Sequence, residues 1–191
     1  MNVSYYETVI AVPASLGSKP YKQHQWLSAY LDSRGKINIP HHFKALSPSV
    51  PAIHLRSLEP VTDSSVLIEY DIKAGDDVTI YLEYCVSSNI SKGNRTDKIG
   101  KQVETFPSPE NMHAVVLKRL MAKTGLAGEI VEISSVKKTH IGKHAKGFIP
   151  SVDVIVRGVI HKPELYKLAL EQGIGKKRAF GMGMIMAIDN G

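Results

Sequence analysis

Apolar residues along the chain follow two spacings, one typical of strands and one typical of helices. Strands are predicted where β-branched and aromatic residues concentrate, and in the first part of the chain these are residues 5–12, 37–45, 52–58 and 65–72. In the second part they are residues 78–87, 129–136, 148–160 and 182–188. Helices with apolar side chains three and four positions apart are predicted from residues 17–20 to about residue 32, over 109–125 and over 163–172.

Three polar segments separate these elements. Residues 73–77 are the best candidate for a linker, because they combine glycine with small and charged residues. Residues 88–107 are polar and contain glycine, so we expect a long loop there. Residues 137–147 are expected to form a second loop, strongly basic, at the tip of a hairpin.

The order of elements in the second half is strand, helix, two strands, helix, strand, which is the ferredoxin-like pattern. The first half follows the same order but leaves no room for a complete second helix. The sequence therefore predicts an α+β protein of two tandem ferredoxin-like (RRM-like) domains, residues 1–74 and 77–191, of which the first is degenerate. This fold supports many functions, so it does not identify one.

Charge is distributed unevenly between the two halves. Residues 1–90 carry seven Lys/Arg and nine Asp/Glu, whereas residues 91–191 carry 17 Lys/Arg and nine Asp/Glu. A net charge of +8 in one half favours a polyanionic partner, because each phosphate contact releases condensed counterions. The alternative interpretation is a solvated basic surface that serves only solubility.

Other functional classes are disfavoured by what the sequence contains. A single cysteine, Cys85, allows neither an internal disulfide nor a CxxC zinc motif, and it fits a reducing cytoplasm. No run of eighteen apolar residues exists, so no membrane partner is expected. Residues 1–16 resemble a strand more than a signal peptide.

The first candidate for chemistry is the start of the N-terminal helix. Tyr21 and His24 are three positions apart and so share a helix face. Histidine is the side chain best suited to proton transfer near neutral pH, and metal-free RNA cleavage needs little more than one group that accepts a proton and one that donates it. The alternative is a structural histidine, because His24, Leu27 and Leu31 form one helical stripe.

The second candidate is residues 173–183 (GIGKKRAFGMG), where four glycines surround three consecutive cations. Glycine lets a backbone approach a phosphate closely, so Gly173, Gly175, Lys176, Lys177 and Arg178 are predicted to contact RNA. The segment follows a helix and precedes a strand, which is the reverse of a dinucleotide fingerprint. The alternative is a helix cap that leads into an edge strand, for which Gly173 alone would suffice.

Two polar loops supply further candidate RNA contacts, with a mobile solvated loop as the alternative in each case. These candidates are Lys92, Arg95, Lys98 and Lys101 in the first loop, and Lys137, Lys138, Lys143, His144 and Lys146 in the second. No metal site or cofactor is predicted. His41 and His42 are adjacent and would point to opposite faces of a strand, and His140 and His144 lack the HExxH helix context.

Together these features resemble the CasE-type CRISPR repeat-processing endoribonucleases of the RAMP superfamily. The resemblance is carried by residues 156–160 (VRGVI), the helix after them, 172–175 (QGIG) and 180–185 (FGMGMI), and by Tyr21, His24 and Leu27 on the first helix. It covers most of the chain, although the middle matches only in its pattern of elements.

The resemblance implies an enzyme that binds the repeat hairpin and cuts at its 3′ base by attack of a 2′-hydroxyl. The products would carry a 2′,3′-cyclic phosphate and a 5′-hydroxyl. His24 would be the general acid or base and Tyr21 would orient the phosphate or assist proton transfer. The protein would stay bound to its product with other subunits of a CRISPR surveillance complex. Two alternatives stay open, a non-catalytic repeat-binding subunit and a small-molecule-binding ferredoxin-like module.

Overall fold

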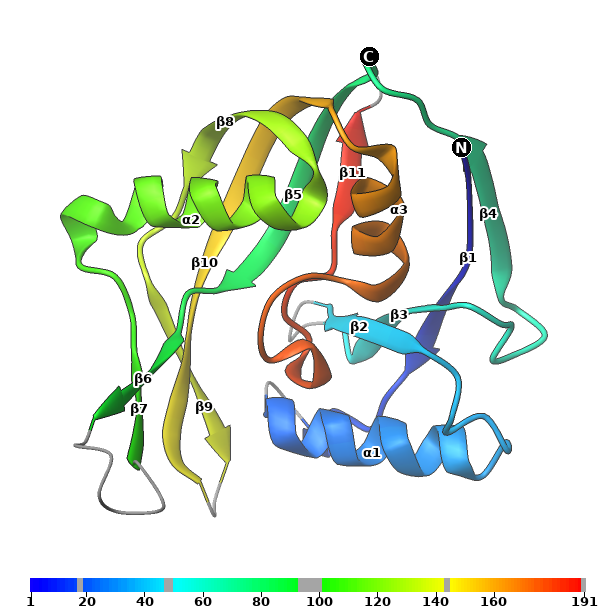
Figure 1. Ribbon diagram of the computed structural model, residues 1–191. Coiled ribbons are helices and arrows are strands. Elements are labelled where there is room, and N and C mark those ends of the chain that lie inside the picture. Colours follow the sequence, from blue (N-terminus) through cyan, green and yellow to red (C-terminus); the bar gives the residue numbers. More distant parts are fainter. Residues whose placement is uncertain (17–18, 47–49, 93–100, 143–144, 190–191) are drawn as a thin grey trace.

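The computed structural model describes residues 1–16, 19–46, 50–92, 101–142 and 145–189 (Figure 1). Its first part contains β1 (Asn2–Ala11), η1 (Ala14–Leu16), α1 (Pro20–Asp32), β2 (His41–Ala45), β3 (Ala52–Ser57) and β4 (Val66–Asp71). Its second part contains β5 (Asp77–Cys85), β6 (Ser88–Lys92), β7 (Lys101–Thr105), α2 (Pro109–Thr124), β8 (Leu126–Ile133), β9 (Lys137–Gly142), β10 (Ala145–Ile160), α3 (Pro163–Gln172), η2 (Arg178–Phe180) and β11 (Met186–Asp189).

The two halves of the chain form two antiparallel sheets with the same strand order. The first sheet runs β2-β3-β1-β4, and the second runs β11-β5-β10-β8, with β9 added on β10. We number the four strands of each order as they follow one another in the chain: β1, β2, β3 and β4 in the first sheet, and β5, β8, β10 and β11 in the second. Both sheets then place the fourth strand beside the first, and the third beside the second. This arrangement confirms the predicted tandem ferredoxin-like fold and the missing second helix, because β3 leads to β4 without one. The division of the chain at residues 74–77 stays a prediction.

Each helix lies where its apolar stripe can be buried. Leu27 and Leu31 of α1 are completely buried against Phe43 of β2 and Leu55 of β3. The helices α2 and α3 pack on the second sheet, where Leu120 is fully buried. A second face of α3 lies against β1, β2 and β3, so this helix stands between the two sheets (Figure 1).

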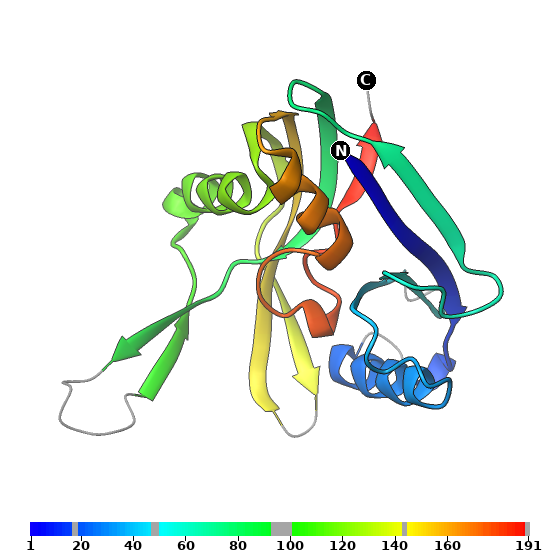
Figure 2. The ribbon, with the colours of Figure 1, turned by 45° about the vertical axis from the view of Figure 1, so that its right-hand side comes forward.

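Several strands differ from those predicted from the sequence, and the structure shows why. Residues 88–107 were expected to be a loop, but β6 and β7 pair as an antiparallel ribbon that extends away from the body (Figure 2). Residues 137–147 likewise include β9 and the start of β10. Polar ribbons of this kind are held by backbone hydrogen bonds, which leave little trace in side-chain pattern. The strand predicted at 182–188 begins only at Met186. Before it, the Gly183 N–H donates to the Glu83 carbonyl of β5, but the Gly183 carbonyl accepts from Ile174 of the glycine-rich segment.

A buried guanidinium joins the first sheet to α3. Arg56, which is 2% exposed, donates from Nη2 and Nε to Glu7 Oε1 at 2.6 and 3.1 Å. Its Nη1 donates to the carbonyl oxygen of Leu170 at 2.9 Å, and its Cζ lies 4.1 Å from the centre of the Tyr5 ring. The carbonyl belongs to the last turn of α3, where the helix supplies no N–H donor for its carbonyl oxygens. This contact therefore fixes the end of α3 against β3.

A second polar chain links the sheets on the side of β9. Lys44 of β2 donates to the Tyr81 hydroxyl at 2.9 Å, and Tyr81 donates to Asp153 at 3.1 Å. Asp153 also pairs with Lys137 at the start of β9. The base of the basic hairpin is thus tied through β5 and β10 to the N-terminal sheet.

In the described ranges, no helix has the length and apolar character needed to cross a membrane.

Glu7→Gln tests the buried guanidinium pair. Burial alone would raise the pKa of Glu7, but hydrogen bonds with His54 and Arg56 outweigh it and lower the pKa to about 2. A carboxyl group with a lowered pKa in the folded state stabilises the protein above its unfolded value, about 4.3, and loses that contribution as the pH falls toward 2. We expect Glu7→Gln to lower the free energy of unfolding at pH 7 by roughly 2 kcal/mol.

The matched control is Glu59→Gln, because Glu59 is exposed and lies 3.7 Å from Lys36. It should change stability by less than about 0.5 kcal/mol. Urea unfolding at several pH values measures both effects, and Glu7→Gln should also flatten the loss of stability between about pH 4.5 and 2. Equal stability of the two variants would contradict the assignment.

Candidate functional site

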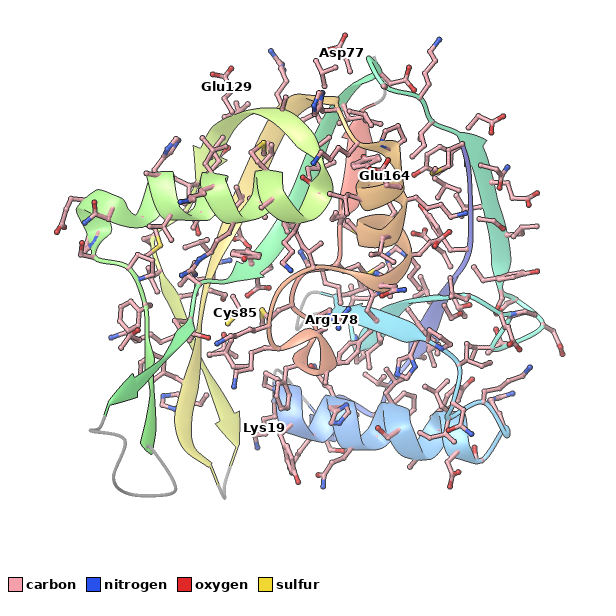
Figure 3. All side chains as sticks on the ribbon, in the orientation of Figure 1. Lys19, Asp77, Cys85, Glu129, Glu164 and Arg178 are labelled. Atoms are coloured by element: carbon pink, nitrogen blue, oxygen red, sulfur yellow. The ribbon has the colours of Figure 1, made fainter. Side chains whose placement is uncertain are left out.

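A cleft of about 790 Å³ opens where α1, β2 and the segment after α3 meet. We call it the histidine cleft and define it by its lining: His24, Pro40, His41, His42, Phe43, Gln172, Gly175, Lys177, Arg178, Ala179 and Phe180. These residues come from three separate parts of the sequence. Figure 3 labels Arg178 on the loop that faces α1. The cleft brings together the two candidates that the sequence had flagged separately, the first helix and the glycine-rich segment.

His24 lies at the edge of the buried stripe of α1. The ring is half-buried and meets Phe180 edge to face, with 5.8 Å between ring centres and 69° between the planes. Burial lowers the pKa of His24, and the charge of nearby His41 adds to the effect. The imidazole is therefore held in its neutral form near pH 7, which is the form that accepts a proton. His24 lies on the same helix stripe as buried Leu27 and also lines the cleft. Its position is therefore compatible with the structural and with the catalytic interpretation.

Tyr21 occupies a different position. It is 41% exposed and does not belong to the residues that line the histidine cleft. The structure therefore does not bring Tyr21 and His24 together in one hollow, although they lie one turn apart on α1. A role for Tyr21 in orienting a phosphate stays a prediction.

Two further histidines line the cleft from β2. His41 is half-buried, and its Nδ1 lies 2.8 Å from the carbonyl oxygen of Ile39. His42 is 1% exposed, and neither of its ring nitrogens has a hydrogen-bond partner among the described residues. Burial, with additional effects of Arg56, Arg178 and His41, lowers the pKa of His42 to about 3. His42 is therefore a neutral part of the cleft wall at any physiological pH.

The glycine-rich segment folds back on itself, and this explains much of its composition. The backbone N–H of Ile174 donates to the carbonyl oxygen of Gly183 at 2.9 Å. Gly183 has φ +77°, and a Cβ there would lie 1.9 Å from the Ile174 oxygen. A Cβ on Gly173, with φ +68°, would come within 3.3 Å of the His42 ring. These glycines allow the segment to close over β2, whether or not it also contacts a phosphate.

The charged residues of this segment are cations. Lys176 and Arg178 are exposed and Lys177 is half-buried. Arg178 donates from Nη1 to the carbonyl oxygen of Gln172 at 2.9 Å, which holds its side chain along the mouth of the cleft. The described lining contains neither Asp nor Glu. Lys176 and Arg178 also line a neighbouring hollow of about 670 Å³ with Arg119 and Lys123. The combined surface is suited to an anion.

The basic hairpin of β9 and β10 lies beside α1, so it belongs to the same side of the molecule as the cleft (Figure 1). Lys137 is paired with Asp153, whereas exposed Lys138 stands 5.3 Å from the centre of the Phe148 ring. Other candidates fall on strands whose side chains are not described, namely Lys92, Lys101 and Lys146. Arg95, Lys98, Lys143 and His144 lie outside the described residues.

Sequence reasoning missed the contributions of His41, His42 and Phe180. It considered the two adjacent histidines only as metal ligands. Across the described ranges, no group of three or more His, Cys, Asp or Glu residues is placed to hold a metal ion. One feature of the sequence could have indicated His41 and His42. They lie on the first strand after the helix that carries His24, and consecutive elements of a fold are usually adjacent in space.

Gly183→Ala tests whether close backbone packing builds the cleft wall. We expect it to lower the free energy of unfolding by about 2 kcal/mol or more, because the new Cβ meets backbone in addition to the unfavourable φ. Gly35→Ala is the matched control, since Gly35 has φ +66° but nothing within 4 Å of its Cβ position. Its expected cost is about 1 kcal/mol. If urea unfolding gives the same loss of stability for both variants, the backbone around Gly183 accommodates a Cβ and close packing does not build the cleft wall.

Solved structures share this fold, although no protein-family model matches the chain and no curated protein matches its sequence significantly. Thermus thermophilus Cse3, bound to an RNA representing a pre-cleavage complex, aligns with a TM-score of 0.68 and 17% identity over 98% of this chain and 100% of that chain. Cas6e from Escherichia coli str. K-12 aligns with a TM-score of 0.65 and 19% identity over 96% and 98%. A chain of a CRISPR RNA-guided surveillance complex gives 0.65 and 12% over 95% and 98%. At these identities the comparisons establish a common fold that extends over nearly the whole of each chain.

Proposed function

We propose that this protein binds the hairpin of a CRISPR repeat RNA and cuts it at its 3′ base, in the histidine cleft and without a metal ion. One observation carries the proposal. A neutral, accessible imidazole, His24, stands in a cleft whose opposite wall is the cationic segment with Lys177 and Arg178. The fold supports it as well, since structures that share it include a CRISPR endoribonuclease, Cse3, bound to a 19-nucleotide RNA.

The chemistry requires only groups that the cleft contains. The 2′-hydroxyl of the nucleotide before the cut attacks the adjacent phosphorus, forms the P–O2′ bond and displaces the 5′-oxygen of the next nucleotide. His24 takes the proton from the attacking hydroxyl. Lys177 and Arg178 stabilise the negative charge that builds on the phosphate oxygens. Tyr21, which lies outside the cleft on the preceding turn of α1, is an additional group that would orient the phosphate from the solvent side. The products carry a 2′,3′-cyclic phosphate and a 5′-hydroxyl.

The rest of the RNA would lie along the cationic side of the molecule. Lys138 on the β9–β10 hairpin and Lys176 beside the cleft are exposed on that side and can contact the phosphate backbone. A broad contact of this kind favours slow release of the cut hairpin. The proposal therefore includes retention of the product with other subunits of a surveillance complex, in which a chain of the same fold occurs.

Removal of one imidazole tests the catalytic part. We expect His24→Ala to cut the repeat hairpin about 10²- to 10⁴-fold more slowly, because a general base contributes that much to such a reaction. Its affinity for a hairpin with a 2′-deoxy nucleotide at the cut should stay within about threefold of wild type, since an imidazole held neutral adds no phosphate ion pair. The assay is single-turnover cleavage in EDTA, with mapping of the product ends.

The matched control is His113→Ala, because His113 is exposed on α2 and outside the cleft. It should cleave at the wild-type rate. If the wild-type protein binds the hairpin tightly but yields no product in EDTA, the protein is a non-catalytic binding subunit and the catalytic proposal is wrong.

The salt dependence of binding tests the electrostatic part. Lys138→Ala should weaken hairpin binding and reduce the slope of log K against log salt concentration by about one, because one phosphate contact is lost. Lys73→Ala, in the exposed turn between β4 and β5, should leave the slope unchanged. Fluorescence anisotropy across a salt series measures both. Absence of salt-dependent hairpin binding would instead favour the small-molecule-binding alternative.

A further inference from the structure

The lining of the histidine cleft includes a second half-buried imidazole, that of His41. Cleavage by a 2′-hydroxyl leaves a 5′-oxygen that must be protonated as its bond to phosphorus breaks. His24 can serve only one end of this reaction in a single step. The remaining groups of the cleft therefore decide what protonates the leaving oxygen.

β2 places His41 in the lining of the same cleft as His24, and the charge of His41 contributes, after burial, to the lowered pKa of His24. The Nδ1 of His41 lies 2.8 Å from the carbonyl oxygen of Ile39. A carbonyl oxygen only accepts hydrogen bonds, so Nδ1 must carry a proton. The ring orientation is fixed by that bond, and Nε2 is left to exchange a proton with a ligand. This is the arrangement by which a backbone carbonyl orients a working histidine.

The neighbours of His41 are poorer candidates for the same role. His42 is almost completely buried and is kept neutral, so it lacks the second ring proton of an imidazolium acid, and its ring is shielded from a bound RNA. The guanidinium of Arg178 does not release protons in proteins. Lys177 comes from the glycine-rich segment and adds positive charge where the phosphate would sit. The other titratable or charged residues in the lining of this cleft are thus His24 from α1, His42 from β2, and these two cations from the segment after α3.

We propose that His41 is the general acid of the reaction, a role that rests on the proposed function. His24 takes the proton from the 2′-hydroxyl while the P–O2′ bond forms. As the P–O5′ bond breaks, His41 gives the proton on Nε2 to the departing 5′-oxygen. One proton is accepted and one is donated, and the two imidazoles return to their starting forms by exchange with water.

A sulfur-substituted substrate separates the two roles. A repeat hairpin with sulfur in place of the bridging 5′-oxygen at the cut has a leaving group that needs no proton. We expect His41→Ala to cut the all-oxygen hairpin about 10²- to 10⁴-fold more slowly but to cut the sulfur-bridged hairpin within about tenfold of wild type. His24→Ala should be slow on both substrates, because the attacking hydroxyl is unchanged.

A second variant separates chemistry from positioning. The side-chain amide of His41→Asn can donate to the Ile39 carbonyl in place of Nδ1, yet it has no proton to transfer. It should fold like wild type and be as slow as His41→Ala on the all-oxygen hairpin. His161→Ala, exposed before α3, is the control for removal of a histidine elsewhere and should change nothing.

The outcomes distinguish the inference from the function on which it rests. Wild-type cleavage in EDTA together with a wild-type rate for His41→Ala would overturn the role of His41 alone. So would a restored rate in His41→Asn, or a sulfur-bridged hairpin that fails to rescue His41→Ala. Absence of cleavage by the wild-type protein would instead overturn the proposed function, and the general acid with it.

Discussion

The buried guanidinium of Arg56 is the contact on which the position of the cleft depends. It bonds Glu7 within the first sheet and the Leu170 carbonyl in the last turn of α3. Three residues after that carbonyl, Gly173 begins the segment that forms the second wall of the cleft. A buried charge is costly unless its partners are in place, so this joint favours one relative position of the two parts. The N-terminal part then supplies imidazoles and the C-terminal part supplies cations.

Much of the fold could be predicted from the sequence because its helices carry strong local signals. The helix at Pro163–Gln172 has the predicted bounds, and α1 ends at Asp32 as expected. The missing second helix of the first domain followed from simple spacing. The strand ends were less predictable. β2 starts only at His41, after a turn in which the Ile39 N–H donates to the Lys36 carbonyl, and β11 starts only at Met186, after the bond between Ile174 and Gly183. In the polar ribbon of β6 and β7, backbone pairing had no matching side-chain pattern.

The candidate site was predictable in its parts and not in its assembly. His24 stood out by residue type and helix position, and the glycine-rich segment stood out by composition. The two line one cleft because Arg56 bonds the end of α3 and because Ile174 bonds the Gly183 carbonyl. These bonds join residues that are not neighbours in sequence, so no local sequence pattern predicts them. His41 was considered only as a metal ligand together with His42, and was set aside because adjacent strand residues point to opposite faces. Its importance follows from its place beside His24, which is a tertiary fact.

The most direct measurement is a crystal structure of the protein bound to its repeat hairpin with a 2′-deoxy nucleotide at the cut, which blocks the reaction but keeps the phosphate. We expect the scissile phosphate to lie in the histidine cleft, with His24 within hydrogen-bond reach of the 2′ position, His41 Nε2 near the 5′-oxygen, and Lys177 and Arg178 facing the non-bridging oxygens. A complex in which the hairpin occupies another face, with no nucleotide near either ring, would contradict the assignment of this cleft as the catalytic site.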